Sequence, residues 1–444
     1  MDTPIIDFVE KYASKSVERL HMPGHKGLSY IGVESLDVTE IDGADSLYHA
    51  NGIIKQSQDN ASLLFGAHTF YSTEGSSLSI RAMLYLALKY AKDKTNPFVL
   101  AGRNAHKSFI SAVGLLGLDV TWLYPKDNQN YLSCNITACQ VEETFSKLDR
   151  LPIALYLTSP DYLGNILDIS SIKKVCSKYG VLLLVDNAHG SYLKFLSPSC
   201  HPIDLGADMC CDSAHKTLPA LTGAGYLHLS EDLPKELIEL APMATSLFGS
   251  TSPSYLILQS LDLVNKVLSE DYSKTLINYV EKLDKLKSTL IDANYTLVGN
   301  EKLKITIDAK KYGYYGYEIN EHLNKCGVTC EFYDKDLLVA MFTPNSGERG
   351  IEKLQTALLS LPKKAPILER PPQFTYPAKV IPIRQALLCD TERIDVDKAD
   401  GRIFADVCFS CPPAVPIVVC GERIDKKAIA CLKYYGVTDC LVVK

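Results

Sequence analysis

The feature that most constrains the fold is a strand, helix, strand succession in the middle of the chain. Residues 153–160 (IALYLTSP) form an apolar run with a polar end, residues 168–179 (DISSIKKVCSKY) have helical spacing and stop at Gly180, and residues 181–186 (VLLLVD) are apolar again. Apolar strands joined through a helix are typical of parallel sheets that are buried on both faces. The pattern predicts an α/β fold in which the residues that follow each strand gather at one carboxyl edge.

Two residues at this predicted edge point to one kind of chemistry. Asp186 ends the second apolar strand, and Lys216 follows a further predicted strand at residues 208–211. A lysine in such a place can form a Schiff base with pyridoxal phosphate (PLP), and an aspartate can face the pyridine nitrogen of the same cofactor. An aspartate here is more often functional than structural, because a buried carboxylate without a partner has a high desolvation cost. We therefore predict a PLP site around Lys216.

The segment STEGSS at residues 72–77 precedes apolar residues that recur every three to four positions, as in a helix. A glycine with two hydroxyls at a helix start offers backbone N–H groups and the positive end of the helix dipole, which suit a phosphate. A plain serine N-cap is the alternative interpretation.

The segment RNAHKS at residues 103–108 follows a predicted strand at residues 97–101. This order places His106 at the carboxyl end of a strand, where open α/β sheets bind ligands. A flat imidazole in that position can stack on an aromatic cofactor. A helix-capping or core histidine is the alternative.

Periodicity and composition divide the 444 residues into parts. Residues 1–20 have helical spacing and lead into HMPGHKG at residues 21–27, which is either a loop that reaches an active site or a surface turn. A long helical stretch to about Ala293 precedes mixed strand and helix patterns, and six prolines then crowd residues 362–382. We predict an N-terminal arm with an active-site loop (1–56), a large PLP-binding domain (57–262), a connecting helix with a small α+β domain (263–361), a Pro-rich linker (362–382) and a C-terminal domain (383–444).

Charge and hydropathy disfavour several classes of partner. Forty-six basic and 52 acidic residues give a net charge of −6 without a basic block, which disfavours nucleic-acid binding. No apolar run is long enough to span a membrane, and the first 20 residues lack the order of a signal peptide, so we expect a cytoplasmic protein. The 14 cysteines, including the CxxC pair Cys408 and Cys411, are expected to be reduced and structural, and no metal site is predicted.

Taken in order, these motifs resemble those of one family, the Orn/Lys/Arg decarboxylases, which are PLP enzymes of the aspartate aminotransferase fold (fold type I). The matching segments span nearly the whole chain and are HMPGHKG, EGSS, RNAHKS, DNAHG, SAHKT, STSPSY and the C-terminal PPAVP followed by Gly421-Glu422. The chain looks most like the short members, which lack an extra N-terminal wing domain. The resemblance implies a large domain with a mostly parallel sheet, a small α+β domain and a C-terminal domain.

The resemblance also implies a role for each matching residue. Lys216 would hold PLP as a Schiff base, Asp186 would keep the pyridine nitrogen protonated, and His106 would stack on the ring. Either Lys216 or His215 would return a proton to the substrate carbon. The other residues expected to bind the cofactor are Ser76, Ser77, His189, Ser213 and His215, together with Thr251 and Ser252, which would reach the phosphate of a second subunit. The expected unit is therefore a homodimer with active sites at the subunit interface.

The implied activity is PLP-dependent decarboxylation of lysine, arginine or ornithine. The alternatives are another reaction on the same fold, such as transamination or a different lyase reaction, and a non-catalytic PLP-binding homologue. Departures from the family pattern are Glu74 in place of an amide, Asn187 where many short members have glutamate, Asp406, and Phe409-Ser410-Cys411. A basic substrate needs a carboxylate at the far end of its pocket, and the candidates are Glu74, Asp161, Glu331 and Asp406.

Overall fold

The structure is a computed structural model, and it describes residues 1–126, 130–374, 376–407 and 414–444. The chain forms two compact units, each made of two stretches of sequence. The first unit contains Met1–Lys94 and Ile169–Thr275, and the second contains Thr95–Asp168 and Leu276–Lys444. Each unit is described by itself below.

The strands of the first unit are short and almost fully buried. They are β1 (His68–Ser72), β5 (Leu182–Asp186), β6 (Met209–Asp212) and β7 (Gly225–Leu229). β5 and β6 pair in parallel, whereas β7 pairs antiparallel with both β6 and β1.

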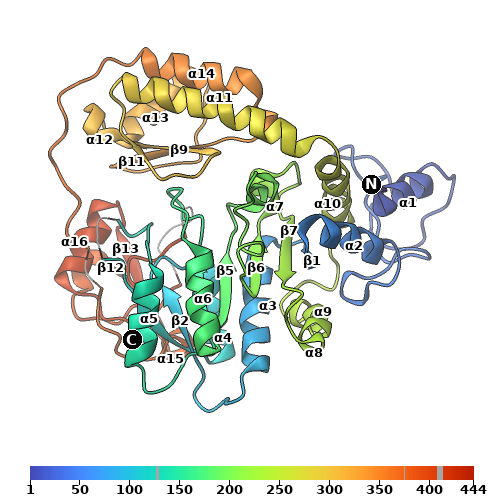
Figure 1. Ribbon diagram of the computed structural model, residues 1–444, viewed down its shortest axis with the longest axis horizontal. Helices are drawn as coiled ribbons and strands as arrows, with labels where there is room; N and C mark the ends of the chain where they lie inside the picture. The colour runs from blue at the N-terminus through green and yellow to red at the C-terminus, as the bar shows by residue number, and fades with distance from the viewer. Residues whose placement is uncertain (127–129, 375, 408–413) are drawn as a thin grey trace. The chain divides into compact units, whose positions relative to one another are not determined.

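Helices pack around these strands as the apolar periodicity predicts. α3 packs against β6 and β7, α6 packs against β5, and α1, α2 and α10 pack on one another (Figure 1). The helices of this unit are α1 (Pro4–Ala13), α2 (Ile53–Phe65), α3 (Gly75–Tyr90), α6 (Ile169–Tyr179), α7 (Ala214–Thr217), α8 (Lys235–Glu239), α9 (Ala241–Ser246) and α10 (Tyr255–Ser269), with 3-10 turns at Leu47–His49 and Ser191–Phe195.

The second unit contains three groups of strands. β2 (Phe98–Gly102) pairs in parallel with β3 (Asp119–Leu123) and with β4 (Ala154–Thr158). A four-stranded antiparallel sheet has the order β10 (Phe332–Tyr333), β11 (Leu337–Met341), β9 (Lys304–Asp308), β8 (Leu297–Val298). β12 (Thr391–Asp395) and β13 (Asp439–Val443) form an antiparallel pair near the C-terminus.

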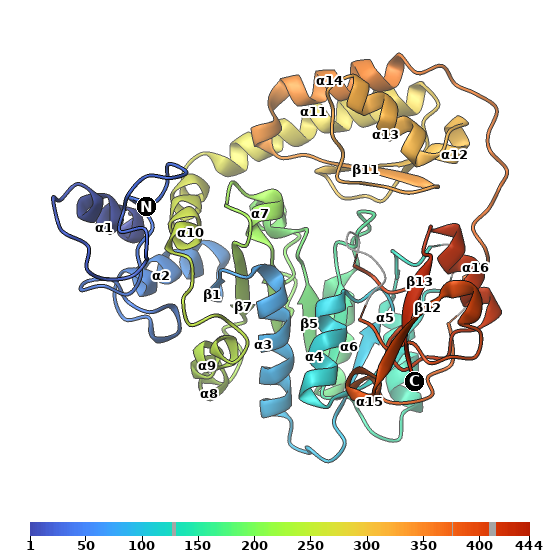
Figure 2. The same cartoon turned by 180° about the vertical axis from the view of Figure 1, so that it is seen from behind.

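Three helices of the second unit, α11, α13 and α14, lie on the same side of its four-stranded sheet (Figures 1 and 2). The predicted helical stretch to Ala293 is wrong as one helix, because α10 ends at Ser269 and α11 begins at Tyr272. Glu270 between them has a ψ of −139°, outside the helical region. The helices are α4 (Lys107–Leu116), α5 (Ala138–Lys147), α11 (Tyr272–Asp292), α12 (Ala309–Tyr312), α13 (Gly316–Lys325), α14 (Gly347–Leu359), α15 (Ile383–Leu388) and α16 (Lys426–Tyr434), with 3-10 turns at Pro344–Ser346 and Val396–Lys398.

Apart from the four-stranded antiparallel sheet and the β12–β13 pair, the strand pairings within each unit are parallel except for those of β7. The predicted α/β class with a mostly parallel sheet is therefore confirmed, and the antiparallel edge was not foreseen.

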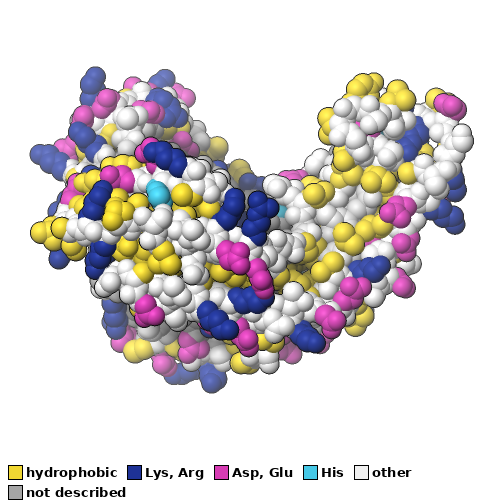
Figure 3. Space-filling model, turned by 90° about the horizontal axis from the view of Figure 1, so that it is seen from above, with side chains coloured by type: hydrophobic (Ala, Val, Ile, Leu, Met, Phe, Trp, Pro, Cys, Tyr) yellow, Lys and Arg dark blue, Asp and Glu magenta, His cyan; other side chains and the backbone are white. Residues whose placement is uncertain are grey.

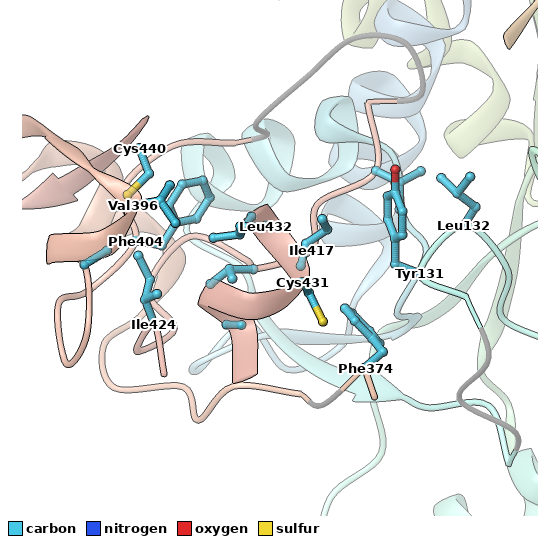
Figure 4. Close-up of a cluster of buried hydrophobic side chains, with 14 of the residues drawn as sticks. Tyr131, Leu132, Phe374, Val396, Phe404, Ile417, Ile424, Cys431, Leu432 and Cys440 are labelled. Carbon is cyan, nitrogen blue, oxygen red and sulfur yellow. The ribbon is translucent and has the colours of Figure 1, made fainter. Parts of the chain in front are cut away.

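Apolar side chains from the four-stranded sheet and from the C-terminal residues form one buried cluster in the second unit. Phe332, Leu337 and Val339 of the sheet contribute to it, as do Phe404 and Leu432. Burial of this surface is the main favourable term that holds the C-terminal residues in place. Figure 4 labels Tyr131, Leu132, Phe374, Val396, Phe404, Ile417, Ile424, Cys431, Leu432 and Cys440 of this cluster.

None of the helices among the described residues combines the length and apolar character needed to cross a lipid bilayer. On the face that Figure 3 displays, basic and acidic side chains are interspersed with hydrophobic ones. The cysteines in the described part of the chain are free thiols. Cys408 and Cys411 lie outside the described residues.

Candidate active site

Lys216 lies in the short helix α7, directly after β6, as the sequence predicts. Its Nζ atom is 3.1 Å from Nε2 of His189, a residue of the turn that follows β5. Because β5 and β6 are parallel neighbours, the residues after them meet at one edge of the sheet. Lys216, His189 and Asp186 therefore come from adjacent strand ends in the first unit.

Asp186 is the last residue of β5, and only 2% of its surface is exposed. Its Oδ1 atom accepts a hydrogen bond from the backbone N–H of Ala188 at 3.2 Å and lies 3.6 Å from Sγ of Cys211. A carboxylate buried to this degree needs partners for its charge. A protonated ring nitrogen is one suitable partner.

The segment STEGSS forms the start of α3, with Gly75 as its first residue. Gly75 has a φ of +63°, which favours glycine, and its N–H donates to the carbonyl of Gly223 at 2.7 Å. Glu74 occupies the N-cap position without a side-chain cap, so the plain serine N-cap interpretation is wrong. Ser76 and Ser77 stand in the first helical turn instead.

Hydroxyl groups from two segments meet at this helix start. The Ser213 hydroxyl donates to Oγ of Ser76 at 2.9 Å. Ser76 and Ser77 are half-buried, and Ser213 is buried. Backbone N–H groups at a helix start together with hydroxyls form a suitable site for a phosphate dianion.

His215 lies beside the same helix start, since a Cβ built on Gly75 would be 3.5 Å from its Cε1 atom. Its Nδ1 atom donates to the carbonyl of Ala224 at 2.8 Å. Burial, with a smaller contribution from the charge of Lys216, lowers the pKa of His215 below its ordinary value. The ring is therefore mostly neutral at pH 7, and Nε2 is a hydrogen-bond acceptor.

The acidic side chain of Glu74, the N-cap residue of α3, turns toward the segment that contains Ser250. It is exposed, and Oε1 accepts a hydrogen bond from the backbone N–H of Ser250 at 2.7 Å. Thr251 and Ser252, which follow, are exposed. Their predicted reach into a second subunit stays a prediction.

His106 belongs to the second unit, where it is the N-cap residue of α4. Its Nδ1 atom accepts from the backbone N–H of Ser108 at 3.1 Å, so the helix-capping interpretation is confirmed. Stacking of its ring on a cofactor stays a prediction. Residues 21–27 form turns at the surface of this chain, and Nε2 of His25 lies 3.2 Å from Oδ2 of Asp37. The reach of this segment to an active site stays a prediction.

The carboxylates that are candidates to bind a basic substrate differ in the hydrogen bonds that they already accept. Asp161 is 2% exposed, burial raises its pKa, and it accepts hydrogen bonds from Leu163 and Asn165, so it stabilises its own loop. Glu331 is exposed and accepts from the Tyr162 hydroxyl at 3.1 Å. Asp406 accepts from the backbone N–H of the next residue at 2.7 Å. Phe409-Ser410-Cys411 lies outside the described residues.

A buried polar cluster that the sequence motifs did not predict adjoins the ends of β5 and β6. Asn187 donates from Nδ2 to Oδ1 of Asp212 at 2.6 Å, and Oδ2 of Asp212 is 3.1 Å from Nε2 of His201 and 3.4 Å from Nε2 of His228. All four side chains are inaccessible to solvent. An aspartate at the end of a strand that is otherwise apolar was the available signal. Atoms of His201, Cys210 and Asp212 lie within 4.8 Å of one another, but hydrogen bonds already use the Asp212 oxygens.

A buried ion pair in the second unit joins two motifs that the sequence showed separately. Arg103 of RNAHKS donates from Nη2 to Oε2 of Glu422 at 3.1 Å, and each side chain is 3% exposed. Arg103 also donates to the carbonyls of Pro416 and Ile417. Satisfying both charges in this way offsets much of their desolvation cost.

The residues of the first unit fit PLP by their chemistry. Lys216 offers the amine for a Schiff base, Asp186 a buried carboxylate for the ring nitrogen, and the start of α3 the donors for a phosphate. A Cβ built on Gly225 would lie 2.9 Å from the carbon of Gly75, so a glycine is needed for this close approach of two backbones.

Comparison with known proteins covers almost the whole chain. Residues 3–312 match the family described as Orn/Lys/Arg decarboxylase, major domain, and residues 376–440 match its C-terminal domain. An arginine decarboxylase of Bacillus subtilis is 30% identical over 464 residues, which is 97% of this chain and 92% of the relative. An arginine decarboxylase of Halalkalibacterium halodurans is 30% identical over 470 residues, covering 97% and 93% of the two chains.

A solved structure shows the same fold. The constitutive lysine decarboxylase of E. coli superimposes with a TM-score of 0.78 at 18% identity, covering 100% of this chain and 82% of that one. At 18% identity, this similarity supports the fold alone. The family match over most of the chain decides the wider relationship: the protein belongs to the Orn/Lys/Arg decarboxylase family.

Proposed function

We propose that the protein is a PLP-dependent carboxy-lyase that decarboxylates a basic amino acid, with lysine, arginine and ornithine as the candidate substrates. The observation that carries the proposal is the 3.1 Å contact between Lys216 Nζ and His189 Nε2, with Asp186 on the same strand end as His189. Relatives named arginine decarboxylase support a basic substrate. The free thiols of the chain fit a reducing compartment, which supports a cytoplasmic location.

When bound, PLP supplies an electron sink for the bond that releases CO2. Asp186 contributes a buried negative charge that favours a proton on the nitrogen facing it. Lys216, in its protonated form, would be placed to return a proton to the substrate carbon. His189 positions Lys216 Nζ through their contact.

His215 and the helix start have a binding role in this scheme. The His215 ring is held by the hydrogen bond from its Nδ1 atom to the Ala224 carbonyl, which leaves Nε2 of the neutral ring as the acceptor for a ligand donor. Ser76, Ser77 and Ser213, with the backbone at the start of α3, would hold the phosphate group. His106 keeps its proposed role as a stacking residue.

A decarboxylation assay with three amino acids tests the proposed substrate class. Purified protein reconstituted with PLP is incubated separately with lysine, arginine and ornithine, while CO2 and the corresponding amine are measured. We expect release from at least one of them and none from the Lys216→Ala variant, which cannot form the Schiff base. Bound PLP without release from any of the three would contradict the substrate class. Keto acid or sulfide as product would favour another reaction of the fold.

A homodimer with shared active sites is part of the proposal. The turn and loop of residues 17–33 expose apolar side chains that a second copy could cover. These include Val17, Leu20, Met22, Leu28, Tyr30 and Ile31, with exposed fractions from 48% to 93%.

Mixing two inactive variants tests the shared site. A mixed dimer of a Lys216→Ala subunit and a Thr251→Ala/Ser252→Ala subunit contains one complete site only if residues 251 and 252 act across the interface. We expect partial recovery of activity on mixing. Activity that stays at the level of the separate variants, in dimers shown by mass to be mixed, would place these residues in the site of their own subunit.

A further inference from the structure

We propose that Asp212 is a positioning residue for the PLP site: through Asn187 it holds the loop after β5 against the end of β6 and so sets Asp186 relative to Lys216. This inference rests on the proposed function as a PLP enzyme. It gives a role to the buried cluster around Asp212, which takes no part in the mechanism proposed above.

Asn187 joins the two strand ends twice. Its backbone N–H donates to the carbonyl of Cys211 at 3.0 Å, and its side-chain amide donates to Oδ1 of Asp212 at 2.6 Å. Asn187 directly follows Asp186, and Asp212 is four residues before Lys216. The side-chain bond therefore links short segments that each carry one predicted cofactor contact.

Asp212 acts from the opposite face of the sheet. Asp186 lies beside Cys211, whereas Asn187 contacts Asp212. Neighbouring residues of a strand point to opposite faces, so Asp212 and Cys211 face opposite ways. Asp212 thus has no need to touch the cofactor, and its influence passes through the backbone between Asn187 and Asp186.

The hydrogen bond between Asn187 and Asp212 has little freedom to change its geometry. Asn187 is fully buried, and a Cβ built on Gly190 would lie 2.0 Å from its Oδ1 atom. A glycine at position 190 is therefore what lets the amide take this orientation. The N–H of Gly190 also donates to the Asn187 carbonyl at 2.8 Å, which closes the turn.

Two imidazoles keep Asp212 a strong acceptor. Burial raises the pKa of Asp212, but His201 and His228 more than compensate and hold it well below its ordinary range. Phe65 packs against both imidazoles, with ring centroids 5.6 Å and 4.4 Å away, and the Thr69 hydroxyl is 2.9 Å from Nδ1 of His228. A hydrogen bond to an ionised carboxylate is shorter and stronger than a neutral one, as the 2.6 Å distance to Asn187 illustrates.

The test compares Asp212→Asn, Asn187→Ala and the double variant with a matched control, Asp262→Asn. Asp262 is also a fully buried carboxylate of the first unit, but it contacts Ser57 and the backbone of Ile5 and Ile6. Three quantities are measured: the melting temperature of the apo protein, the rate of PLP release, and the pH midpoint of the visible absorbance of the bound cofactor.

We expect Asp212→Asn and Asn187→Ala to speed PLP release by about tenfold, the size typical for loss of an outer-shell partner. The absorbance midpoint should move by on the order of half a pH unit, because the Asp186 carboxylate is displaced. The double variant should be no worse than the single ones, since both break one bond. Asp262→Asn should leave the release rate and the midpoint unchanged.

A purely structural role predicts lower apo melting temperatures with unchanged release rate and midpoint, and that result overturns the inference. Asn187→Ala keeps the contacts of Asp212 with His201 and His228 intact, so it decides the matter if Asp212→Asn does not fold. Wild-type protein that binds PLP but releases no CO2 would contradict the proposed activity. The role of Asp212 could then still be tested through the release rate and the absorbance midpoint of the bound cofactor. Wild-type protein that binds no PLP would overturn both.

Discussion

Oε1 of Glu74 accepts a hydrogen bond from the backbone N–H of Ser250 at 2.7 Å. Glu74 immediately precedes the helix start that is proposed to bind phosphate, and Ser250 precedes Thr251 and Ser252. The residue that departs from the family pattern thus anchors a second segment of the proposed site. Its negative charge nevertheless stays close to the N-terminus of α3.

Glu74→Gln should tighten PLP binding, because it removes a charge near the phosphate and keeps an oxygen acceptor for Ser250. The gain should be about two- to fivefold at low salt and should shrink at high salt, since exposed charges are screened. Equilibrium binding of PLP at two ionic strengths measures it. Equal or weaker PLP binding by Glu74→Gln would contradict the charge argument, and Glu74→Ala, which also removes the acceptor for Ser250, measures the role of that hydrogen bond.

Asp186→Asn should lower kcat much more than it raises KM. The neutral amide cannot stabilise a proton on the facing nitrogen, and the loss of one preorganised electrostatic group costs about 10²–10³ in kcat. Steady-state kinetics at saturating PLP, with the substrate that shows turnover, measures this. An equal rise in KM without a fall in kcat would assign Asp186 to binding only.

His215→Asn should leave the shape of the pH profile of kcat unchanged above pH 7. The pKa of His215 lies below its ordinary value because of burial and of the Lys216 charge, so the wild-type ring is already mostly neutral above that value. An asparagine amide can still donate to the Ala224 carbonyl. We expect a loss of less than about tenfold. A loss beyond about 10²-fold, with an altered alkaline limb, would identify His215 as the proton donor instead of Lys216.

Asp262→Asn should flatten the pH dependence of stability. Burial raises the pKa of Asp262 from 3.8 to about 6, so the folded protein holds this proton more tightly than the unfolded chain. The contribution of this carboxyl group to stability is therefore greatest below about pH 4, falls as pH rises to about 6, and is constant above, a change of at most about 3 kcal/mol. The difference in melting temperature between variant and wild type should grow from pH 4.5 to pH 7.5. A difference that does not vary with pH would contradict the assignment.

Local sequence patterns predicted those strands and helices whose burial can be recognised within a single segment. The apolar runs before Pro160 and Asp186 and the helix that ends at Gly180 are β4, β5 and α6 with small shifts at their ends. Their periodicity reflects burial, which each segment shows in its own residues. The domain boundaries stay a prediction, because the compact units are made of stretches that are discontinuous in sequence.

Contacts between distant residues required the structure. Arg103 and Glu422 are 319 positions apart, and Glu74 and Ser250 are 176 apart. A sequence pattern gives each of these residues a charge or a polar group but not its partner. The break between α10 and α11 was similarly hidden, because no glycine or proline marks Glu270.

The sequence by itself determined that Lys216 and Asp186 follow apolar strands of a parallel sheet, and the order of its motifs determined the family. Only the tertiary structure decided that Glu74 turns to Ser250, that His106 caps a helix and that Asn187 donates a hydrogen bond to Asp212. The physical reason is that strand and helix patterns record whether a side chain is buried. The direction of a buried polar group depends instead on which donors and acceptors the packed elements bring within hydrogen-bond distance.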